Sequence, residues 1–426
     1  MSTRLDFFSA AVFAAALLHS FCVSPIHRAA RRRTKGSVLR AFLLVLGEIE
    51  AVFALWSAVL LAGMLSADGA VGTWQYLAGL SWSEPAFVGI ILVMAGTRPV
   101  IQLAERGISA VAAGLPRISP SVAIYFSILT LGPLLGSLIT EPAAMTVSAW
   151  LLKDRIYDRD PSRRLGYATI AVLFVNISIG GALTPFAAPP LLMVVHRFGW
   201  DFAFVFRNFG WKALLAVVLN AGIVSLIFRR ELSHSRFAPA PPVTRTPVPL
   251  GLTAMHLALL AALVFWSHSP ALLVLISVAF LAVTRATHRH QDGLRLREGA
   301  MVSLFLGGLV IIGARQAGWL SGVLAPLHSG SLFAAATGLT AIIDNAALTY
   351  LGGQVPNLAP ILRYSLVAGA LAGGGLTLIA NAPNPAGYSL LADYFERDDA
   401  GGLSPLRLLA AALAPTAIAI ACLGWL

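Results

Sequence analysis

Two short segments of the chain each place a single carboxylate in the middle of an apolar run. Residues 139–146 read ITEPAAMT and residues 342–349 read IIDNAALT, so that Glu141 aligns with Asp344. A carboxylate at the depth of a lipid bilayer costs about 2.5–3.5 kcal/mol even on lenient insertion scales, and such residues are functional by default. We therefore predict that the two segments are the tips of two re-entrant hairpins, which form an ion site near the middle of a membrane.

The composition places these segments in a membrane protein. Hydrophobic residues make up 58% of the chain and charged residues 12%, whereas soluble domains carry about 25% charged residues. The net charge of +11 could indicate a nucleic-acid partner, but in so apolar a chain it indicates basic cytoplasmic loops. We therefore expect the lipid bilayer, and no nucleic acid, as the partner of this chain.

The apolar runs predict an all-α polytopic membrane protein with about ten crossings, because a spanning helix needs about 20 apolar residues. Two re-entrant hairpins are predicted at 121–152 and 331–354, and two helices broken by Gly and Pro at 165–196 and 362–392. A short interfacial helix is expected at 105–120. The remaining spans are predicted at 7–26, 41–66, 84–104, 211–228, 251–267, 270–284, 299–317 and 405–425.

The distribution of Lys and Arg predicts the orientation of these spans. When alternate loops are assigned to the cytoplasm, they hold 23 of the 30 basic residues, and only six lie on the outer side. Both termini then lie outside the cytoplasm, and residues 1–230 and 251–426 become inverted copies joined by a Pro-rich cytoplasmic linker at 231–250. The loops assigned to the cytoplasm are 27–40, 105–120, 153–164, 229–250, 285–298 and 393–407.

Three short matches, in the same order in both halves, support this duplication. Residues 92–98 (LVMAGTR) match 309–315 (LVIIGAR), and the two hairpin tips match each other. The third match joins Gly180-Gly181-Ala182-Leu183-Thr184 to Gly373-Gly374-Gly375-Leu376-Thr377. Inverted repeats with broken helices are typical of secondary transporters.

Polar residues at the tips and in the broken helices complete the candidate site. Carboxylate, carbonyl and hydroxyl oxygens suit a hard cation such as sodium, and the broken helices would expose backbone carbonyls opposite each tip. Two alternatives remain, since the carboxylates could simply cap the returning half-helices, and the breaks could be Pro kinks for packing. The candidate cation- or proton-binding residues are Glu141, Asp344, Asn345, Thr140, Thr146, Thr349, Asn176, Thr184, Thr377, Asn381 and Asn384.

Four further charges could support the site. Glu48 and Glu50 lie within the second predicted span and point to different helix faces. Either could carry a proton, pair with Arg98 or form a structural ion pair. Arg98 and Arg315 recur in the repeat, and they could neutralise the tip carboxylates or extend to the membrane surface.

Several other chemistries find no support in the sequence. The nine histidines form no metal-binding spacing, and neither a Gly-x-Ser-x-Gly motif nor a Walker-type phosphate loop occurs. The two cysteines, Cys22 and Cys422, are predicted at opposite membrane faces, so we expect neither a disulfide nor a transition-metal site. We expect no cofactor beyond transported sodium and protons.

The second tip, DNAALT at 344–349, and the later segment ANAPNP at 380–385 together resemble the ion transporter superfamily. That group includes arsenite permeases, sodium/proton antiporters and dicarboxylate/sodium symporters, and the greatest likeness is to its bacterial sodium/proton antiporter family. The resemblance implies a scaffold domain and a mobile transport domain that holds both hairpins. It further implies a homodimer in the inner membrane of a bacterium.

The tips differ from those of the dicarboxylate symporters in this superfamily, which carry Ser-Asn-Thr. Here residues 140–142 read Thr-Glu-Pro and residues 344–346 read Asp-Asn-Ala. These acidic groups would repel an anion and suit a cation or a proton.

The sequence therefore predicts a secondary transporter that exchanges sodium, or another monovalent cation, for protons by alternating access. The first alternative is an anion transporter for arsenite-like oxyanions or organic acids, with Arg98 and Arg315 as counter-charges. The second is an intramembrane enzyme that uses Glu141 and Asp344 as an acid/base pair. A non-transporting scaffold is the last alternative, and the duplicated helix breaks argue against it.

Overall fold

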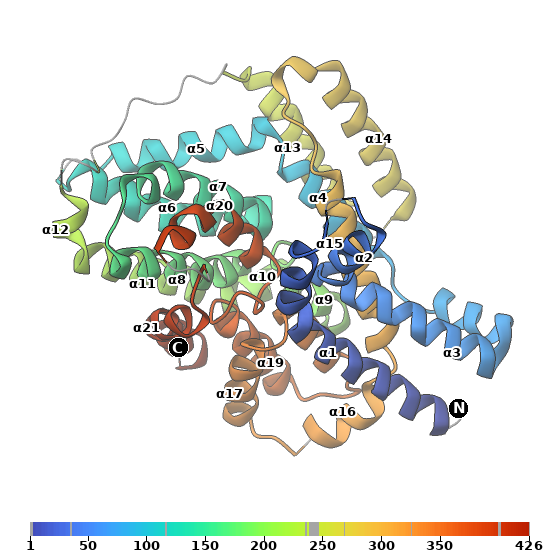
Figure 1. Ribbon diagram of the computed structural model, residues 1–426. Coiled ribbons are helices and arrows are strands. Elements are labelled where there is room, and N and C mark those ends of the chain that lie inside the picture. Colours follow the sequence, from blue (N-terminus) through green and yellow to red (C-terminus); the bar gives the residue numbers. More distant parts are fainter. Residues whose placement is uncertain are drawn as a thin grey trace.

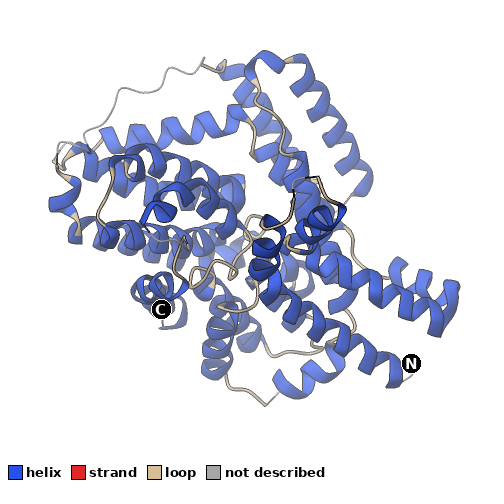
Figure 2. Cartoon of the chain, viewed as in Figure 1, coloured by secondary structure: helices blue, strands red, loops and turns tan. Residues whose placement is uncertain are grey.

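The computed structural model describes residues 3–34, 36–115, 117–234, 237, 247–267, 269–324, 326–398 and 402–425. Most of the predicted linker at 231–250 lies outside these residues. The described part is helical and contains no strand (Figure 2). The longer helices are α1 (Thr3–Arg31), α2 (Val38–Leu46), α3 (Ile49–Ala78), α4 (Ser83–Ala95), α5 (Arg98–Ala113), α6 (Pro120–Ile139), α7 (Glu141–Arg155), α8 (Arg163–Gly180), α9 (Pro189–Phe198), α11 (Trp211–Ile227), α13 (Leu250–Phe265), α14 (Pro270–Ala286), α15 (Leu296–Gly313), α16 (Ala317–Leu324), α17 (Ser329–Thr340), α18 (Asn345–Gly353), α19 (Pro360–Gly373), α20 (Pro383–Asp398) and α21 (Pro405–Trp425).

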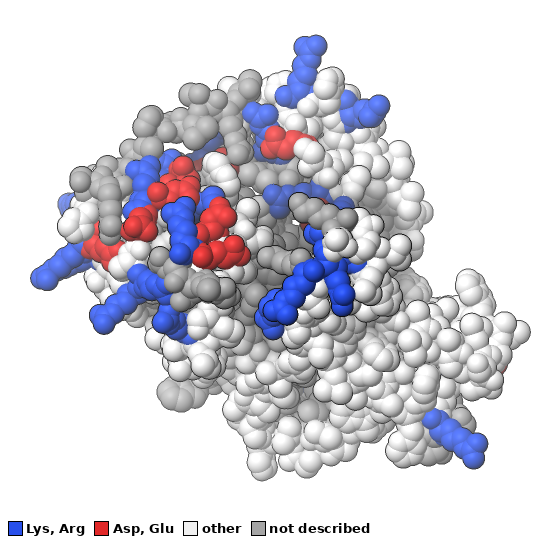
Figure 3. Space-filling view, in the orientation of Figure 1, with Lys and Arg blue, Asp and Glu red and all other residues white. Residues whose placement is uncertain are grey.

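The helices confirm a polytopic membrane protein. Within the described residues, seven helices are long and apolar enough to cross a membrane, and an eighth is added if the bent pair of α4 and α5 counts as one span. Large apolar side chains remain exposed on the surface, such as Phe265 (82%) and Leu226 (66%), which suits contact with lipid. In Figure 3 the charged side chains gather over the upper left of the view, and the lower right is almost uncharged.

The predicted continuous span at 84–104 was wrong, because the helix breaks at its centre. Helix α4 ends at Ala95, and α5 starts at Arg98 at an angle of 67° to α4. Gly96 ends the first helix and Thr97 is extended, with φ −81° and ψ 150°. Pro99 then falls in the first turn of α5, where a missing N–H costs nothing. Residues 105–113 of the predicted interfacial helix at 105–120 are therefore the second half of α5, which ends before the predicted helix does.

The predicted second span at 41–66 is also broken. Helix α2 ends at Leu46, Gly47 caps it, and α3 begins at Ile49 after the extended residue Glu48. Glu48 thus precedes α3, and the prediction that it lies within a span was wrong.

The helices pack in two groups. One group joins α1, α3, α4 and α15, and the other joins α6, α7, α8, α11 and α20 with α9, α17, α18, α19 and α21. In Figure 1 the second group lies to the left of α1 and α3. Both predicted hairpin segments and both broken helices belong to this second group, which positions the site.

The hairpin tips and the helix breaks are short connections between helices of this group. Helices α6 and α7 pack along each other and are joined by Thr140 alone, and α17 and α18 are joined by residues 341–344. The first broken helix passes from α8 through a short 3₁₀ turn (Gly181–Leu183) to α9, and the second from α19 to α20. The Gly-Gly pairs and the prolines lie at or beside both breaks, as expected from their low helix propensity.

Candidate functional site

The Glu141 side chain is fully buried at the tip between α6 and α7. It occupies the first position of α7 and makes no capping hydrogen bond to that helix. Its Oε2 accepts a hydrogen bond of 2.7 Å from the Asn381 Nδ2, at the second helix break. Its Oε1 is buried and has no donor among the described residues. A buried carboxylate with one empty acceptor site is a place for a proton or a cation.

The other tip carboxylate is used differently. The Asp344 Oδ1 accepts from the backbone amides of Ala346 (2.9 Å) and Ala347 (3.2 Å) and so caps α18. Asp344 is half-buried, in contrast to Glu141. The two carboxylates that align in the sequence therefore differ in their contacts, and the capping alternative describes Asp344 but not Glu141.

The second helix break connects the two tips. The backbone N–H of Asn345 donates to the Ala380 carbonyl over 3.0 Å. The next residue, Asn381, donates to Glu141. One short segment of chain therefore contacts both tips, which brings the two matched motifs to one place.

The first Gly-Gly pair lies against the first hairpin. A Cβ on Gly180 would lie 2.6 Å from the Pro133 carbonyl oxygen, and one on Gly181 would lie 2.9 Å from the Glu141 Oε1. Real Cβ atoms do not approach other atoms so closely, so only glycine lets the broken helix touch the hairpin arm and its tip.

The second Gly-Gly pair repeats these contacts at the second hairpin. A Cβ on Gly373 would overlap the Thr337 carbonyl oxygen, and one on Gly374 would lie 2.8 Å from the Asn345 Nδ2. The matched glycines therefore have the same packing task in both halves.

The two matched threonines also make equivalent bonds. The Thr184 Oγ1 donates to the Ser137 carbonyl and the Thr377 Oγ1 to the Ala341 carbonyl, each over 2.7 Å. Each hydroxyl thus ties a broken helix to the last turn of a hairpin arm. These hydrogen bonds fix the geometry of the site.

Three other predicted site residues donate hydrogen bonds to backbone carbonyls of helices. Thr146 and Thr349 donate to backbone carbonyls one turn earlier. Asn176 donates to the carbonyls of Leu129 and Val217. Asn176 therefore binds backbone of α6 and α11, and the structure does not bring it to the tips.

Unpaired buried oxygens remain at the tips and the second break. They have no hydrogen-bond donor among the described residues, and carboxylate, amide and hydroxyl oxygens are ligands that hard cations prefer. An unpaired buried oxygen costs about 1–3 kcal/mol, so these atoms are candidate acceptors for a proton or a cation. These atoms are the Thr140 Oγ1, Glu141 Oε1, Asn345 Oδ1, Asn381 Oδ1 and Asn384 Oδ1.

Thr140 adopts a strained backbone at this site. Its φ of 73° and ψ of 153° lie in a region that essentially only glycine occupies freely, at a cost of about 1–3 kcal/mol. We expect Thr140→Gly to raise the thermal unfolding temperature in detergent, because this strain is relieved. The same change removes a candidate ligand oxygen and should weaken ion affinity about fivefold.

The matched control for this change is Thr140→Ser, which keeps the hydroxyl. It should bind the ion nearly as the parent does, in a titration that follows stabilisation against heat. A Thr140→Gly variant with unchanged ion affinity would exclude the Thr140 Oγ1 as a ligand.

A cavity of about 240 Å³ opens beside the first tip. Thr140, Pro142 and Thr146 line its inner wall, and Arg295 and Arg297 line its other side. The Arg295 Nη1 donates to the Thr146 Oγ1 over 2.9 Å. Sequence reasoning missed Arg295, because it lies in a basic loop that had been assigned only an orienting role.

Two of the four predicted supporting charges, Glu48 and Arg315, form ion pairs with residues other than Glu141. Glu48 forms an ion pair of 2.9 Å with Arg297, and both residues line the cavity, as in the structural ion-pair alternative. Arg98 begins α5 and does not line this cavity. The side chain of Glu50 lies outside the described part of the chain.

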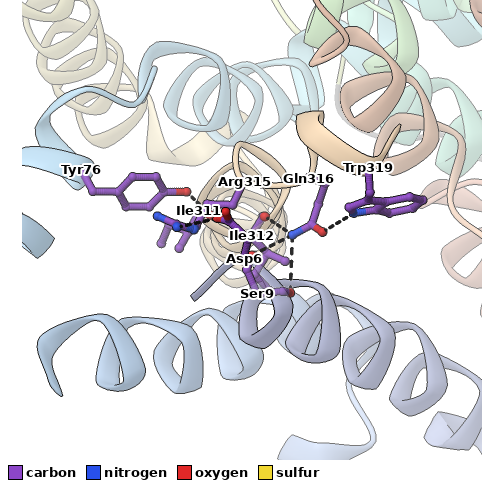
Figure 4. Close-up of polar contacts among 8 residues, drawn as sticks. All are labelled: Asp6, Ser9, Tyr76, Ile311, Ile312, Arg315, Gln316 and Trp319. Carbon is purple, nitrogen blue, oxygen red and sulfur yellow. Dashed lines mark hydrogen bonds and ion pairs between the residues drawn. The ribbon is translucent and has the colours of Figure 1, made fainter. Parts of the chain in front are cut away.

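Arg315 takes part in a separate network near the start of α1. Figure 4 shows its guanidinium beside Asp6, with an ion pair of 3.0 Å, and 5.7 Å from the centre of the Tyr76 ring. The neighbouring Gln316 donates to Ser9 on α1. Arg315 therefore fastens α1 to the end of α15.

The described residues contain no group of three or more His, Cys, Asp or Glu side chains that could hold a transition metal. Two broken helices that meet two helix tips around a buried carboxylate define the class of protein, a membrane transporter.

The chain belongs to the family described as "Putative Na+/H+ antiporter", which matches residues 4–426. This match confirms the resemblance found in the sequence. Among solved structures, the chain is similar to the YdaH transporter of Alcanivorax borkumensis, with 15% identity and a TM-score of 0.42 over 88% of this chain and 96% of that one. A comparison with curated proteins found no match.

Proposed function

We propose that this protein exchanges sodium, or another monovalent cation, for protons, and that the two compete for the Glu141 carboxylate. The observation that carries the proposal is the buried Glu141 with one oxygen bonded to Asn381 and the other unpaired. A proton or a small cation can complete this arrangement, and each would exclude the other. Asn345, Asn381 and Thr140 would add neutral oxygens for the cation.

The repeated contacts of the Gly-Gly pairs and threonines support two inverted halves. Each broken helix is tied to its own hairpin by the same three kinds of contact. Both hairpins and both broken helices lie in one packed group, and α1, α3, α4 and α15 form another. We infer that the group with the hairpins is the moving transport domain and that the group of α1, α3, α4 and α15 is the scaffold, as alternating access requires.

The cavity supports an inward-facing state. Arg295, Arg297 and Glu48 line it, and the loop at 285–298 is one of the basic loops that the sequence assigns to the cytoplasm. We propose that the protein lies in the inner membrane of a bacterium with both termini outside the cytoplasm, and that it forms a homodimer.

Everted membrane vesicles with a fluorescent pH probe test the exchange directly. Respiration acidifies the vesicles, and added sodium should then release protons when the protein is present. Lithium and potassium additions identify the preferred cation. Absence of proton release with every monovalent cation, at pH values from 6 to 9 (roughly the span over which shifted carboxylates titrate), would contradict the proposal.

A second candidate function is favoured by the arginines of the cavity. Arg295 is half-buried and contacts the tip through Thr146, so the cavity also offers a positively charged side chain to an incoming anion. An arsenite-like oxyanion or an organic acid would bind there through charge-assisted hydrogen bonds.

Arg295→Ala separates the two candidates. In a cation exchanger, removal of a positive charge from the cavity should lower the half-saturating cation concentration about fivefold, because about 1 kcal/mol of repulsion disappears. In an anion transporter, the same variant should lose uptake. Arg297→Ala serves as the control, because Arg297 lines the same cavity but is paired with Glu48.

A further inference from the structure

We propose that a groove between the start of α6 and the end of α11 binds an anionic phospholipid, with the lipid phosphate on three arginines and an acyl chain along the two helices. The groove has a volume of about 970 Å³ and is separate from the cavity at the first tip. Arg117, Arg229 and Arg230 line its charged end. This site is independent of the proposed ion exchange.

The three arginines converge because two packed helices end at the same level. Arg117 lies three residues before α6 begins at Pro120, and Arg229 and Arg230 begin α12 (Arg229–Leu232) directly after α11. Helices α6 and α11 are in contact, and α12 also contacts α6. In Figure 1, α12 lies at the left edge of the molecule, beside α6 and α11.

The side chains of these three arginines are available to a ligand. All three are exposed, and their side chains form no ion pair or hydrogen bond within the described part of the chain. The adjacent carboxylate of Glu231 accepts from both the N–H and the hydroxyl of Ser162. Three guanidinium groups around one groove suit a phosphate, which accepts several charge-assisted hydrogen bonds.

The start of α6 adds to this anion site. Ser119 lines the groove, and its side chain makes no capping hydrogen bond to α6. The first amides of a 20-residue helix therefore lack a side-chain acceptor there. The N-terminal end of a helix attracts phosphate groups.

The rest of the groove is apolar, and this selects a lipid over a soluble anion. Val122 and Phe126 line it from α6, and Gly222 and Leu226 line it from α11, so each helix contributes two positions one turn apart. Leu226 is 66% exposed. A free phosphate would gain nothing from this wall, whereas an acyl chain gains about 0.8 kcal/mol for each CH₂ that it buries.

The level of the groove also fits a lipid. Residues 120–139 and 202–227 are both candidate membrane spans, and the arginines lie just beyond their ends. The loops that carry the arginines are among those assigned to the cytoplasm, and each Arg near an anionic membrane surface gains about 1 kcal/mol from its attraction to anionic lipids. The phosphate would therefore meet the arginines at the membrane surface.

Native mass spectrometry of the purified full-length protein, with phosphatidylglycerol or phosphatidylcholine added in detergent, tests the site. We expect phosphatidylglycerol to bind at least tenfold more tightly. The triple variant Arg117→Gln, Arg229→Gln, Arg230→Gln should lose this preference. Each arginine that is removed should lower the affinity for phosphatidylglycerol about fivefold.

The matched control is Arg28→Gln, Arg32→Gln, Arg33→Gln. It removes the same charge from another cytoplasmically assigned loop, where the arginines line a pocket together with Pro25 and Ala29. Equal loss of binding in both triple variants would overturn the proposal, because the attraction would then be a general effect of charge.

Two further arms distinguish a lipid from free phosphate. A Cβ at Gly222 would meet only the Phe126 ring, at 4.0 Å, so Gly222→Leu should fold and fill the apolar wall. We expect it to weaken phosphatidylglycerol binding at least fivefold with all three arginines intact. Displacement of the lipid by millimolar inorganic phosphate, or unchanged lipid binding in Gly222→Leu, would contradict a lipid site.

Discussion

Glu141→Gln should abolish cation-dependent proton release in everted vesicles while leaving the protein folded in the membrane. Gln has nearly the same shape and can still meet the Asn381 side chain, but it carries neither a proton nor a negative charge. The change replaces a charged ligand oxygen by a neutral amide oxygen, and an interaction that involves a charged group contributes about 1.5–3 kcal/mol, so cation affinity should also fall about 10- to 100-fold. Both partners of the exchange are affected, because they share one carboxylate.

The matched control for this change is Glu396→Gln. Glu396 is exposed near the end of α20, so the same chemical change is made outside the site, and exchange should continue as in the parent. If Glu141→Gln also exchanges cations for protons at the parent rate, with equal amounts of protein in the vesicles, then Glu141 is not the shared site and the proposed function is wrong.

Asp344 allows its charge to be separated from its role as a helix cap. Asn is as good an N-cap residue as Asp, so Asp344→Asn should keep the bonds to Ala346 and Ala347 and the thermal stability of the parent. We expect it nevertheless to lower cation affinity about tenfold. The reason is that a fixed negative charge beside a low-dielectric site is worth about 1 kcal/mol or more.

Asp344→Ala removes both the charge and the cap. It should show the same weakened affinity and, in addition, a loss of stability of about 0.5–2 kcal/mol, seen as a lower unfolding temperature in detergent. A transport assay in which Asp344→Asn equals the parent and only Asp344→Ala is impaired would show that Asp344 acts solely as a cap.

The sequence does not distinguish the roles of the basic residues in the loops assigned to the cytoplasm, such as Arg229 and Arg295. In the sequence all of them count equally toward the orientation of the protein. In the structure Arg295 bonds to Thr146 beside the ion site, Arg297 pairs with Glu48, and Arg229 lines a groove. The same residue type in the same set of loops thus has three different surroundings.

Some helix ends were encoded locally but were missed by reasoning from apolar length. Gly96 and Pro99 mark the bend between α4 and α5, and Gly47 marks the end of α2. The apolar residues continue across each break, so a count of about 20 apolar residues joined helices that the backbone separates. A helix-breaking residue decides the path of the backbone even where the hydropathy of the sequence does not change.

The sequence by itself determined that the chain is a membrane protein, that Glu141 and Asp344 lie at helix tips, and that paired glycines interrupt two helices. These are local signals, because a charge in an apolar run is costly and glycine favours a break wherever it stands.

Only the tertiary structure decided which polar groups meet at the site. Asn381 is 240 positions from Glu141, yet it holds that carboxylate. Asp344 caps its own helix, although its sequence aligns with that of Glu141. A hydrogen-bond partner is chosen by the packing of distant helices, since each bond depends on a few tenths of an ångström that residue spacing along the chain does not specify.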